Sequence, residues 1–185
     1  MPKHIALVNG SLRRQSFNQS VADYVKSALA SKGCTVTQLD ISNLPLMNQD
    51  LEFPAPPAVS AIREEIKKAD ALWTVTPEYN GSVPAPLKNL LDWISRPVQQ
   101  GDSGPPDFVE GKLVAMSGAA GRSAASLVLN ELKGLLGRMA MKPMEQTAGV
   151  SIPAEAFRTG TFVLTEAHKK LFDRQVEHFL EELQA

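Results

Sequence analysis

The sequence predicts a single α/β domain built on a doubly wound, five-stranded parallel sheet with helices on both faces. The first observation behind this prediction is that short apolar runs alternate with longer stretches of helical period along the whole chain. The second is length, because 185 residues can bury a full core without a disulfide or a structural metal. The third is the globular balance of 43% hydrophobic and 21% charged residues. We expect residues 1–185 to form one domain.

The first two strands are expected near the amino terminus. Residues 5–8 are an unbroken apolar run, as in a parallel strand that is covered on both faces. Apolar residues then recur at helical spacing over 21–29, and Gly33 is placed to end that helix. The second strand follows at 35–39.

The middle of the chain alternates in the same way. Residues 41–57 carry four prolines and no periodicity, which predicts a long surface loop. A helix over 58–68 leads to an apolar third strand at 71–75, and a helical stripe follows at 87–94. Residues 97–110 are rich in turn-forming residues and are expected to form a second long loop.

The carboxyl-terminal third completes the pattern. A fourth strand is expected at 113–116, a helical stripe at 128–139, a weaker fifth strand near 143–150 and an amphipathic helix at 172–183. Five strands interleaved with five helices imply right-handed crossovers and therefore the doubly wound parallel sheet.

Composition excludes several classes of function. Nineteen basic and twenty acidic residues give a net charge of -1, so the chain has no electrostatic attraction for nucleic acid or an anionic membrane surface. The single cysteine, Cys34, can form no intrachain disulfide, and the three histidines are scattered, so no metal site is expected. The first residues lack the apolar stretch of a secretory signal, and no segment approaches the length of a membrane-spanning helix. We therefore expect a cytoplasmic protein.

Three loops leave the carboxyl ends of predicted strands, at 9–18, 76–84 and 117–124. In doubly wound sheets the ligand binds beyond this edge, where the strand order reverses. We therefore expect the three loops to converge on one site.

The first loop combines donors for an anion with the start of a helix. Ser11, Ser16 and Asn18 supply hydroxyl and amide groups. Arg13 adds a full charge, and the helix start adds unpaired N–H groups. These are the groups that bind a phosphate monoester. The alternative is that Ser16 only caps the helix, with Gln19 completing a capping box.

The amino-acid sequence of this loop excludes two common phosphate-binding motifs. It contains no Gly-Lys-Ser/Thr sequence, so it is not a nucleoside triphosphate loop of the Walker type. It has one glycine, Gly10, where a dinucleotide fingerprint has three. A mononucleotide phosphate remains as the expected ligand.

The second loop has a stiff backbone suited to a flat ligand. Pro77, Gly81 and Pro84 shape its turns, so that backbone N–H and C=O groups can bind the polar edge of a heterocycle. Tyr79 could cover a face or an edge of such a ring, and the alternative for these residues is a plain turn with a tyrosine whose tip is buried. Glu78 also admits a role as a catalytic carboxylate, although the sequence identifies no second carboxylate as its partner.

The third loop runs from Ser117 to Ala124 as Ser-Gly-Ala-Ala-Gly-Arg-Ser-Ala. Small residues of this kind let the backbone approach a planar ligand closely. Taken alone this signal has low specificity, because strand-to-helix turns often contain glycine.

These motifs together resemble a known family. The segments GSLRRQSFN at 10–18 and PEYNGSVPAPLKNLLDW at 77–93, with the loop at 117–124, are similar to the NADPH-dependent FMN reductase family, and within it to the bacterial quinone and chromate reductase type. The resemblance extends over essentially the whole chain, with the motifs in the right order and spacing. It implies a flavodoxin-like fold with strand order 2-1-3-4-5 and noncovalently bound FMN. It also implies NADPH or NADH as electron donor and a homodimer or homotetramer.

The resemblance also assigns the site. Near the phosphate it implies Ser11, Arg13, Ser16, Phe17 and Asn18; beside the isoalloxazine ring, Pro77, Glu78, Tyr79, Asn80 and Gly81; and at the other edge of the ring, Ser117, Gly118 and Gly121.

The chain departs from the family pattern at two kinds of position. Ala85 and Ala124 stand where relatives commonly carry glycine, which puts the close fit of the third loop in question. The 97–110 loop is longer than usual and could reshape the entrance for the substrate.

The function expected from this reading is an FMN-dependent NAD(P)H oxidoreductase. Hydride would pass through bound FMN to quinones, azo compounds, chromate or similar acceptors by a ping-pong mechanism, with no side chain needed as catalytic acid or base. One alternative is a flavodoxin-like electron carrier or an FMN-binding sensor without turnover. Such carriers usually have a strongly acidic surface, which a net charge of -1 does not provide. A second alternative is a nucleoside deoxyribosyltransferase-like enzyme with Glu78 as nucleophile.

Overall fold

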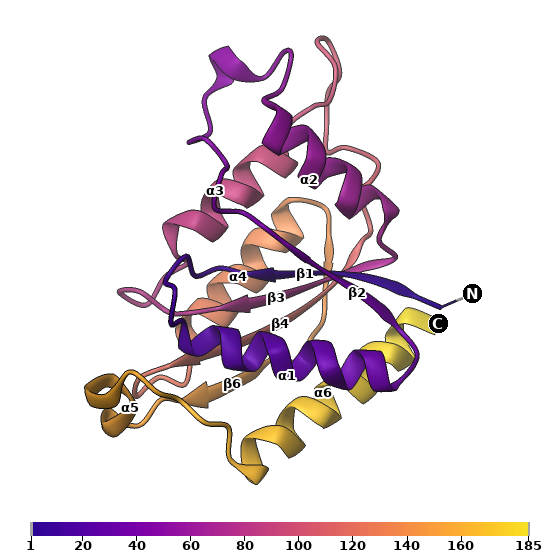
Figure 1. Cartoon of the computed structure of the whole chain (residues 1–185). Helices are drawn as coiled ribbons and strands as arrows, with labels where there is room; N and C mark the ends of the chain where they lie inside the picture. Colours follow the sequence, from indigo (N-terminus) through magenta and orange to yellow (C-terminus); the bar gives the residue numbers. More distant parts are fainter. Residues whose placement is uncertain (1, 185) are drawn as a thin grey trace.

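The structure, a computed structural model that describes residues 2–184, arranges helices in layers on the two faces of a parallel sheet (Figure 1). The strands are β1 (His4–Asn9), β2 (Thr35–Leu39), β3 (Ala71–Thr76), β4 (Leu113–Ala120), β5 (Lys142–Pro143) and β6 (Ala148–Ser151). They are all parallel, in the order β2-β1-β3-β4-β5, and β6 also pairs with β4. The predicted doubly wound sheet with order 2-1-3-4-5 is confirmed.

The fifth strand position is divided between two short strands. β5 pairs with the beginning of β4, at Leu113 and Val114, and β6 pairs with its end, from Ser117 to Ala120. The sequence predicted one weak strand over 143–150. In β5 the N–H groups of Lys142 and Met144 donate to the carbonyls of Lys112 and Val114 (both 2.9 Å).

Alternate strand residues face two separate cores. In β1, Ile5 and Leu7 belong to the core cluster on one face of the sheet, and Ala6 and Val8 belong to the cluster on the other. Both faces are therefore covered, as the unbroken apolar run predicted.

Five long helices cover the two faces. α1 (Phe17–Ser31) and α6 (Glu166–Gln184) pack on one face, and Figure 1 shows them side by side. α2 (Pro57–Lys68), α3 (Ala85–Ile94) and α4 (Ser126–Arg138) pack on the other. The sequence did not predict α5 (Ala154–Thr159) or the single turn η1 (Gln49–Leu51). These two elements bury almost no apolar residues, so they show no helical period.

The proline-rich 41–57 segment is bound along α3. Asn89 accepts a hydrogen bond from the Met47 N–H (2.7 Å), and both Asn89 and Trp93 donate to the Pro45 carbonyl (2.9 and 2.8 Å). Beyond the helix end, Arg96 forms an ion pair with the buried carboxylate of Glu52, and this bond raises the pKa of Arg96. Within this chain, Trp93 and Arg96 therefore both hold the long loop in place.

None of the helices in residues 2–184 is both long enough and apolar enough to cross a membrane.

Candidate functional site

A pocket of about 100 Å³ lies beyond the carboxyl ends of β1, β3, β4 and β6. Most of the residues expected at the site line it: Ser11, Arg13, Ser16, Phe17, Asn18, Pro77, Glu78, Tyr79 and Gly121. Ala119 and Ala120 of the third loop line it as well, together with Ile152 and Phe157, which the sequence did not single out. Residues of all three loops therefore line one pocket, as the positions of the loops after parallel strands predicted.

The amino terminus of α1 opens onto this pocket. Ser16 is the N-cap residue, yet its side chain forms no capping hydrogen bond within residues 2–184, and the first turn of the helix contains no acidic residue. The Gln19 side chain bonds to Asn9 (2.9 Å) and to Asp23 (2.7 Å) instead of completing a capping box. The capping-box alternative is therefore wrong, and the first N–H groups of α1, with the Ser16 hydroxyl, are available to an anion.

Arg13 places a positive charge beside this helix end. Its guanidinium carbon lies 4.3 Å from the centre of the Phe17 ring, a cation–π contact that holds the side chain against α1. No carboxylate of the described residues pairs with it. The charge is therefore free to bind an anionic ligand.

The turn that carries these groups is shaped by its own hydrogen bonds. The Ser11 N–H donates to the Asn9 side chain (3.1 Å), and the Gly10 N–H donates to the Val75 carbonyl (2.8 Å), which ties the turn to β3. A side chain at Gly10 would lie 3.1 Å from Leu87, so glycine lets the turn approach α3 closely. Contacts within the chain thus fix the start of the first loop.

Asn18 has a different role from the one expected of its side chain. Its amide donates to the Ala119 carbonyl (2.9 Å) and accepts from the Ala119 N–H (2.8 Å), and the residue is buried. These two bonds fix the start of α1 against β4. Asn18 can therefore offer a ligand its backbone N–H, but its amide group is already bonded.

The second loop ends in a tight hairpin turn. Tyr79 and Ser82 bond to each other through their backbones (3.3 and 3.0 Å), and between them Asn80 (φ 54°) and Gly81 (φ 74°) are left-handed. Asn-Gly is the typical sequence of such two-residue turns. Asn80 and Gly81 form its tip and are not among the residues that line the pocket, whereas Tyr79 lines it with half of its surface exposed.

Glu78 acts as a cap for α4. Its carboxylate accepts hydrogen bonds from the Ser123 hydroxyl (2.5 Å) and from the N–H groups of Leu127 (3.1 Å) and Val128 (3.0 Å). The N-cap residue of α4, Ala125, has no side-chain acceptor of its own. A carboxylate held by three donors is a poor nucleophile, so the structure disfavours the deoxyribosyltransferase alternative.

Ser117 and Gly118 lie inside β4, because this strand extends to Ala120 instead of ending at residue 116. Ser117 is fully buried. Its hydroxyl accepts a hydrogen bond from the Trp73 indole (3.0 Å) and donates to Gln175 of α6 (2.6 Å). A Cβ at Gly118 would lie 2.6 Å from the Thr76 carbonyl oxygen. The structure thus gives both residues packing roles below the pocket, and neither lines it.

The turn from β4 to α4 contains backbone strain. Ala124 (φ 50°) and Ala125 (φ 64°) are both left-handed, a conformation that alanine rarely adopts. A Cβ at Gly149 in β6 would overlap the Ala124 carbonyl oxygen. The turn is therefore held between β6 and α4, and Ala124, where the resemblance implied glycine, is one of its two left-handed alanines.

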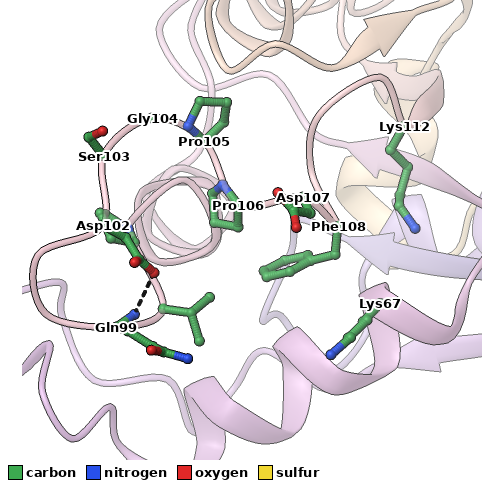
Figure 2. A pocket seen from close by; sticks show the side chains of 12 residues that line it. Lys67, Gln99, Asp102, Ser103, Gly104, Pro105, Pro106, Asp107, Phe108 and Lys112 are labelled. Atoms are coloured by element: carbon green, nitrogen blue, oxygen red, sulfur yellow. Dashed lines mark hydrogen bonds between the residues drawn. The ribbon is translucent and has the colours of Figure 1, made fainter.

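The long 97–110 loop lies at the amino ends of the strands, opposite the pocket, and leads into the start of β4. With Lys67 and Lys112 it lines a cavity of about 750 Å³, and Figure 2 shows Phe108 and Lys67 projecting toward the same hollow. Lys112 donates to the carbonyls of Ile66 (2.7 Å) and Ala69 at the end of α2, and burial lowers the pKa of its ammonium group. The expectation that this loop reshapes the substrate entrance is wrong within this chain, because its connection to β4 places it at the amino ends of the strands.

A further hollow of about 370 Å³ lies beyond the ends of β1 and β2 and shares Arg13 with the pocket. It also contains Asp40, whose pKa is lowered by hydrogen bonds from the Ser42 side chain and N–H. An ionised carboxylate makes this hollow less suitable for an anion than the pocket at α1.

The residues of the pocket fit a flat, phosphorylated ligand. The open end of α1, the free Arg13 guanidinium and the Ser11 and Ser16 hydroxyls can bind the phosphate. The backbone of the second loop and the small residues Ala119, Ala120 and Gly121 can contact the flat part. Ile152 and Phe157 complete the apolar lining, and no sequence motif marked them because they lie outside the three loops.

Comparisons with known proteins show which sequences and structures this chain resembles. The sequence profile of the NADPH-dependent FMN reductase family matches residues 3–154. The chain is 43% identical over 121 residues to a 2-hydroxy-1,4-benzoquinone reductase of Burkholderia sp., covering 65% of this chain and 66% of that protein. It is 34% identical over 172 residues to an NAD(P)H-dependent FMN reductase of Pseudomonas aeruginosa, covering 92% and 89%. A quinone reductase of Pseudomonas putida matches at 46% identity over about half of each chain, 52% in both cases.

Solved structures give the same picture. The flavoenzyme NAD(P)H:(acceptor) oxidoreductase FerB of Paracoccus denitrificans superposes with a TM-score of 0.83 at 30% identity, over 98% of this chain and 97% of that one. A flavodoxin from an archaeon superposes with a TM-score of 0.63 at 13% identity, which shows the fold alone.

Proposed function

Since the chain belongs to the NADPH-dependent FMN reductase family, we propose that it is an FMN-dependent NAD(P)H:quinone oxidoreductase. One observation carries the proposal: the open amino terminus of α1 and the unpaired charge of Arg13 face the pocket at the switch point of the sheet. This is the site at which the phosphate of FMN can be bound. The quinone reductases of Burkholderia and Pseudomonas putida support a quinone as the acceptor.

The chain's own residues bind and orient the cofactor. Arg13, Ser11, Ser16 and the first N–H groups of α1 would hold the phosphate, and the backbone at Pro77 would hold the polar edge of the ring. When bound, FMN would supply the hydride-transfer chemistry that links NAD(P)H to the acceptor. Because the carboxylate of Glu78 is already bonded, these residues need to provide position and electrostatics and no catalytic acid or base.

We extend the proposal to alternating use of one binding place. Tyr79 lines the pocket and is half exposed, so its ring can contact a second flat ring beside the flavin. A nicotinamide ring and a quinone would then bind there in turn, as a ping-pong mechanism requires. We extend the proposal to azo compounds and chromate as further acceptors, and to a homodimer or homotetramer as the assembly.

Spectroscopy and steady-state kinetics test the proposal together. The purified protein is expected to show flavin absorption, or to gain it on adding FMN, and to oxidise NADPH or NADH when a benzoquinone is present. Initial rates at several quinone concentrations should give parallel double-reciprocal lines. A protein that neither carries flavin nor binds added FMN would contradict the proposal.

The electron-carrier alternative predicts a different result in the same experiment. A carrier would bind FMN but would not oxidise NAD(P)H at a steady rate with a benzoquinone. The net charge of -1 speaks against it, because docking to redox partners usually relies on a strongly acidic surface.

A further inference from the structure

The segment between β6 and α6 supplies a wall of the pocket that no motif predicted. Ile152 and Phe157 of this segment line the pocket together with Arg13, Ser16 and Tyr79. Neither residue is among those proposed above to bind the phosphate or the ring of FMN.

Buried contacts on both sides hold α5 in place. Before the helix, the Ile152 N–H donates to the Ala120 carbonyl at the end of β4 (2.6 Å). Within it Ala156 is buried, and after it Gly160 turns the chain with φ 76° so that Phe162 returns to the core. The position of Phe157 is therefore set by the fold.

Phe157 is nevertheless 58% exposed. Its ring meets Phe17 edge to face, with the centroids 5.4 Å apart and an interplanar angle of 87°. The Arg13 guanidinium also packs against the Phe17 ring, so this one ring contacts both the positive charge and Phe157. A Cβ at Gly160 would lie 3.6 Å from the Gln15 side chain, which places the end of α5 against the first loop. Phe157 thus lies at the anion-binding end of the pocket.

We propose that Phe157 shields the phosphate: its ring covers the Arg13 end of the pocket and keeps water from the ion pair between Arg13 and the phosphate of bound FMN. The inference rests on the proposed function. Excluding water lowers the local dielectric constant, which strengthens the ion pair and makes it less sensitive to salt. A flavin without a phosphate gains nothing from this shielding.

Flavin binding to the full chain, stripped of flavin, tests the proposal. Kd values for FMN and for riboflavin are measured by flavin fluorescence at low and high salt, for the wild type, Phe157→Ala and Phe157→Leu. We expect Phe157→Ala to raise the Kd for FMN about five- to tenfold, with a steeper salt dependence, and to leave the Kd for riboflavin unchanged. Phe157→Leu keeps an apolar cover and should restore most of the affinity. As a matched control, Val163→Ala removes an exposed apolar side chain outside the pocket and should change neither Kd.

Three results would overturn the proposal. The first is an unchanged Kd for FMN in Phe157→Ala. The second is equal weakening of FMN and riboflavin, which would place the contact on the flavin ring. The third is a loss of FMN affinity matched by a lower melting temperature of the flavin-free variant, which would make the role structural. A wild-type protein that binds no FMN would contradict the proposed function itself, before any variant is compared.

Discussion

The first loop and the other two loops carry similar polar residues but use them differently. In the first loop, the Arg13 guanidinium and the Ser16 hydroxyl have no polar side-chain partner among the described residues. In the other two, Glu78 caps α4, and Ser117 belongs to a buried network with Trp73 and Gln175. The difference shows that the type of a polar residue near a site does not reveal whether it binds a ligand or stabilises the fold. Its hydrogen-bond partners within the chain distinguish the two roles.

This comparison predicts two separate kinds of defect. Variants of the unpaired groups of the first loop, Arg13 and Ser16, should weaken flavin binding and leave the flavin-free protein as stable as the wild type. Variants of the bonded groups should reduce the free energy of unfolding of the flavin-free protein. A variant that shows the opposite defect would break the comparison.

The largest effect is expected for Gln175→Leu. Gln175 is fully buried, donates to the Met116 carbonyl (2.8 Å) and accepts from Ser117. Leucine has a similar volume but would leave the carbonyl and the hydroxyl unsatisfied, which should lower the free energy of unfolding by about 2–4 kcal/mol. Urea denaturation of the flavin-free protein measures this loss, and unchanged stability would show that the network contributes nothing.

Glu78→Ala is expected to lower the free energy of unfolding slightly less than Gln175→Leu does. The substitution removes three charge-assisted hydrogen bonds, including those to the first turn of α4. We expect the free energy of unfolding to fall by about 2–3 kcal/mol, measured by the same denaturation. Glu78→Gln keeps an acceptor and should lose only part of this stability. If Glu78→Ala abolished turnover without changing stability, Glu78 would be a catalytic residue.

Arg13→Ala should show the opposite pattern. The loss of a charge-assisted hydrogen bond to phosphate should weaken FMN binding by about 1.5–3 kcal/mol, with little change in the free energy of unfolding. Titration of the flavin-free protein with FMN measures the first quantity and denaturation the second. Arg14→Ala, which removes a neighbouring charge that does not line the pocket, is the matched control. An unchanged Kd in Arg13→Ala would mean that the phosphate binds elsewhere.

Ser16→Ala separates the two uses of one side chain. Because the hydroxyl makes no capping bond, its removal should leave the stability of the flavin-free protein unchanged and weaken FMN binding by about 1 kcal/mol. Comparing FMN with riboflavin by fluorescence titration isolates the phosphate contact. A loss of about 1 kcal/mol in stability would instead restore the capping role that the sequence also allowed.

The sequence predicted the fold and the pocket at which the three loops meet, because both depend on local patterns. Apolar runs and helical stripes fixed the order of strands and helices, and parallel strands bring the loops that follow them to one edge. Long-range partners were not predictable. Ser117 and Gln175 are 58 residues apart, and nothing near Ser117 in the sequence indicates that β4 extends past it. Phe157 was missed because α5 buries too few residues to show a period.

The smallest effect is expected at Ala124, in the turn from β4 to α4. Ala124 has a positive φ, and its left-handed conformation costs roughly 1 kcal/mol, which glycine avoids. Glycine also gains entropy in the unfolded chain, which offsets part of this benefit. We expect Ala124→Gly to raise the free energy of unfolding by about 0.5 kcal/mol, as measured by urea denaturation. The matched control is Ala61→Gly on the exposed side of α2, where the same substitution should lower stability by about 0.5–1 kcal/mol. If glycine stabilises the protein at position 124 and destabilises it at position 61, the turn beside the site contains backbone strain that the helix does not. Equal losses at both would mean that the contacts to Gly149 and α4 stabilise Ala124 enough to remove that strain.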